Sequence, residues 1–354
     1  MRLSVTLISL LYLASAGDIK TVLLNECCGV SVDNIPRLDR GEALGKLVDT
    51  GDDRDLALMG AVRLSVPKQV FLNWYRNVEN YKSSPMVGEA VRLHTPPRPA
   101  DFEKFTIDPN DLKALKSCVP GKCGVKLSAE EIARGQKELD WSAPNVAARA
   151  EAMLREILLK HATAYMLRGD EALPKYQDRP ETLDTGQVFL QLLQGSPYIR
   201  SVSPELATRL QHYPGMAQHY PGMAQHYPGM ASPHPDEEMF YCTRERYGFG
   251  LKPLLNMTHV IIQQPSPDVA VIVAKQIWAS HYYDGSLAVT VLIDAHPGTY
   301  LIYINRSRID LLRRSGFKRA LVNRFAPGAT RKEVLALKRT VEQSAEAKAK
   351  ATGN

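Results

Sequence analysis

The chain lacks the local motifs that anchor several common classes of function. Its 354 residues contain no glycine-rich phosphate loop and no HExxH, GxSxG or CxxCH sequence. Nucleotide-binding, zinc-protease, α/β-hydrolase and c-type haem functions therefore have no sequence support. After residue 16 there is also no apolar run of the roughly 18 residues that would span a bilayer, so no transmembrane segment is expected in the mature protein.

Charge of one sign is not in strong excess. Lys and Arg number 44 against 38 Asp and Glu, which gives a net charge of +6. This mildly basic balance does not indicate a nucleic-acid partner, and none is expected. The hydrophobic fraction of 44% and the charged fraction of 23% are those of an ordinary globular protein.

The first sixteen residues have the pattern of a signal peptide. Arg2 supplies a positive charge, residues 3–13 are mostly apolar, and the small residues Ala14 to Ala16 precede Gly17. A buried N-terminal helix is the alternative. No cysteine follows the expected cleavage site, so a lipid anchor is not expected there. The pattern predicts a periplasmic or secreted protein cleaved before Gly17.

Cysteine is scarce, with five in the chain. In an exported protein cysteines favour disulfides, and Cys118 and Cys123 close a short loop over Pro120-Gly121. Sequence alone does not pair Cys27, Cys28 or Cys242. A four-thiolate zinc site is an alternative, but these spacings are not those of zinc ligands. We therefore expect the Cys118–Cys123 disulfide, no metal and no cofactor.

The remaining chain divides into regions of different character. An apolar run ends at Val66 and is followed by Pro67, which predicts a strand and then a helix. Apolar residues recur at helical spacing from Val146 to Tyr165 and stop at Gly169, with His161 on the same stripe as an expected core residue. The expected regions are an N-terminal α+β region at 17–130, a helical region at 131–210, a repeat-containing loop at 211–235 and a sheet region with C-terminal helices at 236–354.

A perfect tandem repeat lies in the loop at 211–235. QHYPGMA occurs three times between Gln211 and Ala231, and a Pro-Gly in each copy excludes a coiled coil. The period is also too short for a solenoid. Its histidines invite a metal-binding interpretation. The simpler explanation is that a short segment was duplicated by slippage in a surface loop that tolerates insertions.

The residues from Phe249 to Asp310 are rich in β-branched and aromatic side chains and are broken by turn residues at short intervals. Asp284-Gly285 between two apolar runs favours a hairpin. The four predicted strands are Leu254–Gln263, Val269–Tyr283, Ser286–Asp294 and Tyr300–Asn305. We expect an α+β fold in which a mainly antiparallel sheet of about four to six strands, built chiefly from 249–306, packs against helices.

Candidate binding residues lie in these strands. If 269–283 is one strand, Lys275, His281 and Tyr283 share a face, and His259 of the preceding strand can join them. A mostly apolar face with a few polar groups is typical of a small-molecule site. Polar groups packed under helices are the alternative. A Ser286–His281–Asp284 triad is not supported, because triad geometry is spatial and these residues lie close together in sequence.

The C-terminal part is basic. Arg306 and Arg308 close the last predicted strand and are further candidate binding residues, and eleven Lys or Arg occur at 306–339 against Asp310 and Glu333. Thr330 and Glu333 have the spacing of a capping box and predict the start of a separate helix. A solvated surface is the usual meaning of such a charge run, and attraction to an anionic envelope surface is the alternative.

Five blocks of the chain are FGLKPLLNMTHVII, KQIWASHYYDGSLAVTVLI, YLIYINRSRID, CVPGKCGVKLS and SPELATRL. Together they resemble an uncharacterised family of exported bacterial proteins, for which we know no activity. The opening GAVRLSVPKQVFLNWYRNVENY also resembles that of START-like helix-grip domains, in which a strand, a helix pair, an antiparallel sheet and a long C-terminal helix enclose an apolar cavity. This resemblance implies that the helical middle of the chain is an insertion. It does not fix a function.

Three functions remain open from the sequence. The first is periplasmic binding of an apolar or amphipathic small molecule. The second is an enzyme acting on an envelope substrate, with His281 as general acid or base. The third is an envelope interaction protein that uses the basic segment 306–339.

Overall fold

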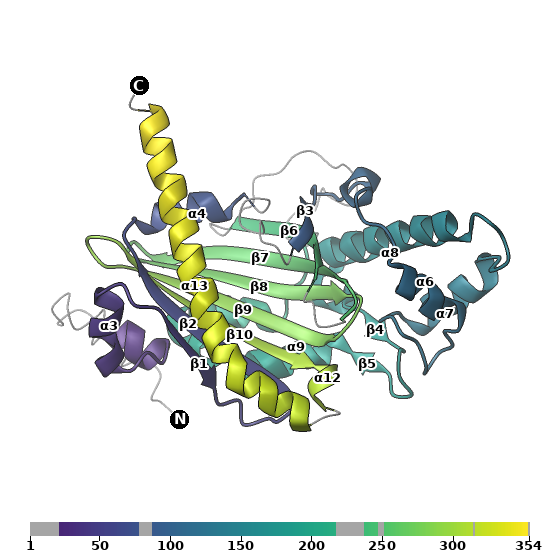
Figure 1. Ribbon diagram of the computed structural model, residues 1–354, viewed down its shortest axis with the longest axis horizontal. Coiled ribbons are helices and arrows are strands. Elements are labelled where there is room, and N and C mark those ends of the chain that lie inside the picture. Colours follow the sequence, from purple (N-terminus) through teal and green to yellow (C-terminus); the bar gives the residue numbers. More distant parts are fainter. Residues whose placement is uncertain (1–20, 78–86, 217–236, 247–250, 314–315, 353–354) are drawn as a thin grey trace.

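An antiparallel sheet of eight strands runs through the centre of the protein, with helices on both of its faces (Figure 1). The structure is a computed structural model that describes residues 21–77, 87–216, 237–246, 251–313 and 316–352. It confirms the expected α+β fold. The predicted signal peptide and the second and third QHYPGMA copies lie outside the described residues.

The sheet is wider than the sequence predicted, because the N-terminal half contributes three of its strands and residues 237–245 contribute a fourth. Its order is β1-β2-β10-β9-β8-β7-β6-β3. The strands are β1 (Leu44–Val48), β2 (Asp55–Leu64), β3 (Val87–Arg92), β6 (Glu237–Glu245), β7 (Leu254–Ser266), β8 (Val269–Ala279), β9 (Tyr283–Asp294) and β10 (Thr299–Ile309). A separate pair is formed by β4 (Lys175–Tyr176) and β5 (Leu183–Asp184).

The helices occupy the N-terminal end, the middle and the C-terminal end of the chain. The α-helices are α3 (Ile35–Asp39), α4 (Lys68–Tyr75), α6 (Pro109–Lys116), α7 (Ala129–Glu138), α8 (Val146–Arg168), α9 (Thr185–Gln194), α10 (Pro197–Val202), α11 (Pro204–Gln211), α12 (Asp310–Arg313) and α13 (Gly316–Thr352). Short 3-10 or π turns are η1 (Leu23–Cys27), η2 (Val32–Asn34), η3 (Pro99–Phe102) and η4 (Gly169–Ala172).

Side chains alternate between the two faces of the sheet, and each face has its own core. Along β8, Val271 and Val273 pack with α9, α10 and α11 on one face, while Ala270 and Ile272 pack on the other face with α4 and α13. The long helix α8 covers a further part of the first face near Trp278. The two faces are called here the α8 face and the α13 face.

The sequence predicted the course of α8 correctly at its C-terminal end. The helix stops at Gly169, whose φ of 58° is easily adopted only by glycine. His161 is half-buried on α8 and its Nε2 lies 2.7 Å from a carboxylate oxygen of Glu131, so it is a paired histidine. Glu131 also completes a capping box with Ser128 at the start of α7.

The C-terminal helix differs from the prediction of two helices. Thr330 and Glu333 do not cap a new helix; they lie inside α13, which continues through Pro327. Packing explains the continuity, because Thr330 and Val334 press onto Gly60 of β2, where any side chain would collide with them. Tertiary packing thus outweighs the local helix-breaking tendency of proline.

The sheet joins strands from the two ends of the chain. The early strand β2 pairs with the last strand β10, and α13 crosses the sheet in front of this pair (Figure 1). Residues 99–216, including α8, are inserted between β3 and its partner β6. One helix, α4, lies between β2 and β3 in the described residues.

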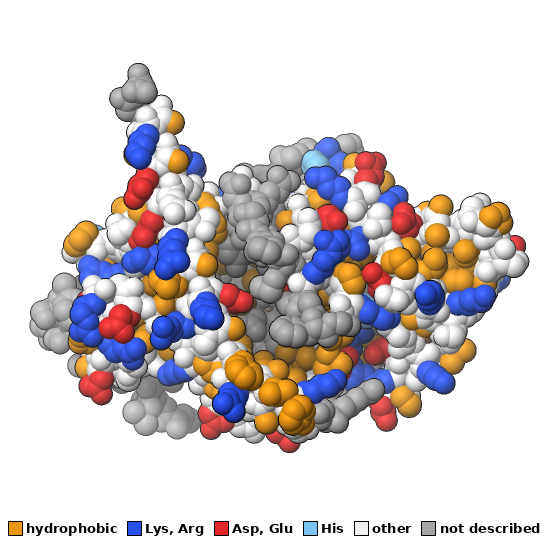
Figure 2. Space-filling model, in the orientation of Figure 1, with side chains coloured by type: hydrophobic (Ala, Val, Ile, Leu, Met, Phe, Trp, Pro, Cys, Tyr) orange, Lys and Arg blue, Asp and Glu red, His pale blue; other side chains and the backbone are white. Residues whose placement is uncertain are grey.

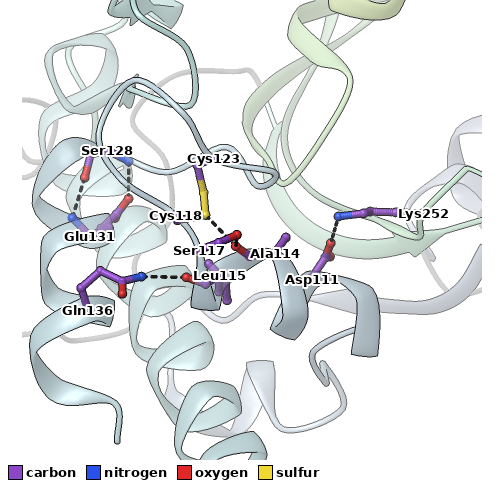
Figure 3. The surroundings of a disulfide bond; sticks show 10 residues. All are labelled: Asp111, Ala114, Leu115, Ser117, Cys118, Cys123, Ser128, Glu131, Gln136 and Lys252. Atoms are coloured by element: carbon purple, nitrogen blue, oxygen red, sulfur yellow. Dashed lines mark hydrogen bonds and ion pairs between the residues drawn. A yellow bond between two sulfur atoms is a disulfide. The ribbon is translucent and has the colours of Figure 1, made fainter. Parts of the chain in front are cut away.

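The predicted disulfide is present. Cys118 and Cys123 are bonded, and Cys118 Sγ also lies 3.3 Å from the carbonyl oxygen of Ala114 in α6 (Figure 3). The loop is fastened to the β4 segment because Cys123 N donates to the carbonyl of Asp178 at 3.0 Å. Cys27, Cys28 and Cys242 are not disulfide-bonded, and Cys28 and Cys242 are buried.

Candidate functional site

A groove of about 580 Å³ opens on the α13 face of the sheet, between α4, α13 and the strands β6 to β10. A volume of this size is ordinary for a small-molecule site. The groove is deepest over Ala274 of β8 and Ala288 of β9, because these cross-strand partners have short side chains. Ala336 gives α13 an equally short side chain over the groove.

Aromatic rings form part of the groove wall. Trp74 and Tyr75 come from α4, Tyr241 from β6, Tyr283 from β9 and Tyr303 from β10. Trp74 and Tyr75 are buried, since their rings also pack into the core beneath α4. Such rings offer flat apolar surfaces together with indole N–H or phenol O–H groups.

One group of uncharged polar side chains lies at the β9–β10 end of the groove. Ser286 Oγ lies 2.8 Å from Ser307 Oγ and accepts a hydrogen bond from Asn305 Nδ2 at 3.0 Å. Ser307 Oγ donates to Asn305 Oδ1 at 2.8 Å. The three side chains hold one another in place, and hydroxyl and amide groups of this kind form further hydrogen bonds readily.

A second polar group lies across β6, β7 and β8. Gln276 Nε2 donates to Asn256 Oδ1 at 3.0 Å, and Thr243 Oγ1 donates to a carboxylate oxygen of Glu245 at 2.9 Å. Asn256 Nδ2 approaches the same Glu245 oxygen at 3.4 Å and so joins the two pairs. The strand register aligns these residues, since Asn256 stands opposite Thr243 on β6.

Glu333 supplies a carboxylate from α13. Part of its side chain is exposed, yet desolvation by the groove raises the pKa of this carboxyl group. No described residue forms a hydrogen bond or ion pair with Glu333. A polar or cationic group of a ligand would therefore find an available acceptor here.

The groove contains Tyr283 but not the other predicted binding residues. Lys275 points to the α8 face, where its Nζ pairs with Asp170 and lies 3.6 Å from the centre of the Phe189 ring. His259, the cross-strand partner of Lys275, is on the same face and lies 3.1 Å from Tyr165 Oη through Nδ1. Burial lowers the pKa of Lys275 to about 8, with the Asp170 carboxylate opposing it.

His259 is a core residue in this arrangement. Burial lowers the pKa of its imidazole well below the usual range, and the charges of Lys275 and Arg209 add to this effect. Its ring stacks on Phe240 with centres 4.5 Å apart. His259 and Lys275 are thus neighbours, as predicted, but in a packed interior under α8.

The expected common face of Lys275, His281 and Tyr283 is wrong, because two irregularities interrupt the alternation. Ile277 is an extra residue in β8 relative to β7, and β8 ends at Ala279. The chain then bends at Tyr282, whose φ is 61°, and Asp284 is an extra residue in β9 relative to β10. Each bulge shifts the following side chains to the opposite face.

His281 lies in the bend after β8, beside a different cleft. Its Nε2 is 2.9 Å from Asp111 Oδ2 of α6. The cleft has a volume of about 550 Å³ and is also lined by Cys123, Lys126 and Asp310. Lys126 is buried, and its Nζ lies 2.9 Å from Asp284 and 3.1 Å from Asp310.

Asp284 is fixed by positive charge at the bottom of this region. Burial alone would raise the pKa of its carboxyl group, but Lys126 and Arg179 outweigh burial and hold the pKa below its usual value. A carboxylate paired in this way stabilises the contact between β9 and the β4 segment. It is not arranged with Ser286 as a triad, because Ser286 points into the groove on the α13 face.

Arg306 and Arg308 form a structural clamp on the α8 face. Both donate to the buried carboxylate of Asp55 on β2, with Nε–oxygen distances of 2.8 Å. Arg306 also donates to the carbonyl of Gly195 at the end of α9, where a side chain on residue 195 would collide with it. These arginines join β10, β2 and α9 and do not reach the groove.

The sequence carries a signal for the groove in its uncharged polar residues. Uncharged polar residues lie on the groove face of β10 at Asn305 and Ser307, two positions apart, and of β9 at Ser286 and Thr290, four positions apart. Together with Gln276, they mark a face that is polar without being charged. The Lys275 and His259 side chains lie on the opposite, packed face.

Comparison with protein-family models, with curated proteins and with solved structures finds no match to this chain. Within the described ranges, no group of three or more His, Cys, Asp or Glu side chains is arranged to hold a metal ion. No described helix is both long enough and apolar enough to cross a membrane. Function has to be inferred from the geometry and chemistry of the groove itself.

Proposed function

We propose that the protein binds an amphipathic small molecule in the groove on the α13 face of the sheet. The observation that carries this proposal is the composition of the groove, in which aromatic rings, hydroxyl groups and carboxamide groups surround about 580 Å³. Binding sites of this kind bury the apolar part of a ligand and orient it by a few polar contacts. The proposed location is the periplasm or the extracellular space.

The charge of the groove indicates which ligands it accepts. Its described lining includes Glu245 and Glu333 and no Lys, Arg or His. An anionic ligand would be repelled by the Glu333 carboxylate at the groove. We therefore propose an uncharged or cationic amphipathic ligand that places its apolar part near the Trp74 and Tyr303 rings and its polar groups near Gln276 or Glu333.

Filling the groove tests this proposal. Ala274→Phe and Ala288→Phe each place a ring where the floor is low, so either variant should stay folded and lose ligand binding. The measurement is native mass spectrometry of the purified protein, followed by identification of small molecules released on denaturation. Ala347→Phe, on an exposed part of α13 away from the groove, is the matched control.

The ligand should be present in the wild type and in Ala347→Phe, and absent from both groove-filling variants. Equal ligand content in all four proteins would show that the molecule is held elsewhere. Absence of any released molecule from wild-type protein, including protein soaked in a membrane extract, would refute binding in the groove.

We propose an enzyme as a second candidate, with His281 as general acid or base. The observation that favours it is the 2.9 Å contact between His281 and Asp111 beside the 550 Å³ cleft, since a carboxylate orients an imidazole for proton transfer. An activity on envelope material that is abolished in His281→Gln with unchanged melting temperature would support it. Retention of that activity in the variant would refute it.

We also propose contact with an anionic envelope surface through the basic segment 306–339. The buried Arg306 and Arg308 are excluded from this role. The remaining basic side chains that favour it are exposed on α13: Lys318, Arg324, Arg331, Lys332 and Arg339. Binding to anionic vesicles that weakens steeply with added salt would support this proposal, and salt-independent binding would contradict it.

A further inference from the structure

We propose that three exposed apolar side chains of α13, Phe317, Leu321 and Phe325, insert into the interface of an anionic phospholipid bilayer. These three residues are called here the apolar stripe. The inference rests on the surface attachment proposed for the basic segment, and it narrows the anionic surface to a lipid bilayer. It adds hydrophobic insertion to charge attraction.

The apolar stripe is exposed to an unusual degree. Phe317 is 75% exposed, Phe325 61% and Leu321 40%. They are four residues apart along an α-helix, so they stand above one another on one side of it. The large hydrophobic side chains that are exposed elsewhere in the described residues, Val32, Val119 and Leu251, lie singly at separate places in the chain.

The stripe faces away from the protein. The side of α13 that packs on the sheet is identified by Thr330, Val334 and Val341, which are buried. At 3.6 residues per turn, the stripe positions fall on the opposite side of the helix. Figure 2 shows hydrophobic side chains gathered next to basic ones around the lower end of α13. The stripe is therefore available to a partner without rearrangement of the fold.

Positive charge borders the stripe. Lys318 and Arg324 stand beside it, and Lys332 and Arg339 follow along the same outward half of the helix. From 316 to 339 the sequence has one acidic residue, Glu333, and this residue lines the groove on the other side. A surface that presents apolar side chains between cations is complementary to anionic headgroups above hydrocarbon chains.

The aromatic rings distinguish a bilayer from an acidic polymer. A soluble polyanion would be bound by the cations alone and would leave Phe317 and Phe325 in water. A bilayer offers hydrocarbon to the rings and phosphate to the cations, so both parts of the surface gain free energy on binding. The same helix walls the groove, so docking would hold the groove next to the lipid surface.

Vesicle flotation tests the inference on the purified protein, with its N-terminus checked by mass spectrometry. Wild type should float with vesicles of phosphatidylcholine and phosphatidylglycerol and bind pure phosphatidylcholine weakly. The double variant Phe317→Ala/Phe325→Ala should bind the anionic vesicles about tenfold less or weaker still. Val32→Ala, which shortens another exposed apolar side chain, should bind like wild type.

A second pair of variants separates this inference from charge attraction alone. Arg324→Gln/Lys332→Gln should weaken vesicle binding and flatten its dependence on salt. If this charge variant binds anionic vesicles more weakly than wild type while the Phe double variant binds them normally, surface attachment is supported and insertion of the stripe is refuted. If both variants bind the vesicles as tightly as wild type, surface attachment and insertion are both refuted.

Insertion also has a direct spectroscopic readout. Phe325→Trp should show a blue shift in tryptophan emission and quenching by brominated lipids when anionic vesicles are added. Unchanged emission on vesicle binding would refute insertion. A further outcome would also refute insertion. If the wild type binds no vesicles and forms a dimer that the Phe double variant does not form, a second copy of the chain covers the stripe.

Discussion

The imidazole Nε2 of His281 lies 2.9 Å from Asp111 Oδ2, and this contact ties the bend after β8 to helix α6. Asp111 also accepts a hydrogen bond from Lys252 Nζ at 2.8 Å, just before β7 begins. One carboxylate thus joins three segments that are distant in the sequence. Both Asp111 and His281 are buried.

Removing His281 should cost stability. His281→Ala leaves the Asp111 carboxylate with one partner fewer, and we expect the free energy of unfolding to fall by about 1–3 kcal/mol. Urea denaturation measures this, with Asp111→Asn as the matched change on the other side of the contact. Unchanged stability together with loss of a catalytic activity would instead favour the enzyme candidate.

Lys275 should make the free energy of unfolding depend on pH in the alkaline range. Its pKa is about 8 in the folded protein, against an ordinary value of 10.5, so the folded state binds this proton more weakly than the unfolded chain does. Raising the pH from about 8 to about 10 should therefore stabilise the protein through this group, by at most roughly 3 kcal/mol. Urea denaturation across this range measures the gain.

Lys275→Met provides the comparison for this pH dependence. The methionine keeps the length of the side chain and does not titrate, so the rise in stability should be smaller in the variant by the contribution of Lys275. Equal slopes for wild type and variant would show that the two states bind the Lys275 proton equally.

The first QHYPGMA copy should matter for folding and the other two should not. Tyr213 of the first copy is 2% exposed, and its Oη donates to Glu238 at 2.6 Å. Tyr213→Ala should lower the free energy of unfolding by about 3 kcal/mol or more. Deletion of 218–231 should leave the melting temperature unchanged, since the entropy of loop closure changes by only about 0.6 kcal/mol for a twofold change in length.

Export should be visible at the N-terminus of the mature protein. Protein isolated from the envelope fraction should begin at Gly17, and non-reducing peptide mapping should recover Cys118 linked to Cys123. Mass spectrometry answers both points in one sample. A cytosolic chain that retains Met1 would contradict the proposed location, and free thiols at both positions would contradict the disulfide.

Local sequence patterns predicted those elements whose packing follows from local chemistry. The stop of α8 at Gly169 and the disulfide over Pro120-Gly121 are of this kind. The strand β2 and the helix after Pro67 were predicted for the same reason, although α4 ends at Tyr75. In each case the residues that decide the structure are neighbours in the sequence.

The candidate site was predicted less well because it depends on distant contacts. Tyr283 reaches the groove only because the bulge at Asp284 turns it to the α13 face. The residues at this position do not predict a bulge. The partners of Lys275 and His281 are Asp170 and Asp111, far away in the sequence. The chemistry of these side chains was visible, but the face on which each would lie was not.

Because β2 pairs with β10, the sheet cannot be completed in the cell until the C-terminal part of the chain has been made. Leu64 is the partner of Thr299, so two segments far apart in the chain must meet to join the β1–β2 hairpin to the rest of the sheet. A chain that emerges N-terminus first from a ribosome or a translocation channel presents the β1–β2 hairpin long before β10 is available. During that interval β2 exposes one unsatisfied edge, which attracts any other extended chain. Newly made protein should therefore aggregate less when the N-terminal hairpin is kept apart from other chains until the last strand is available.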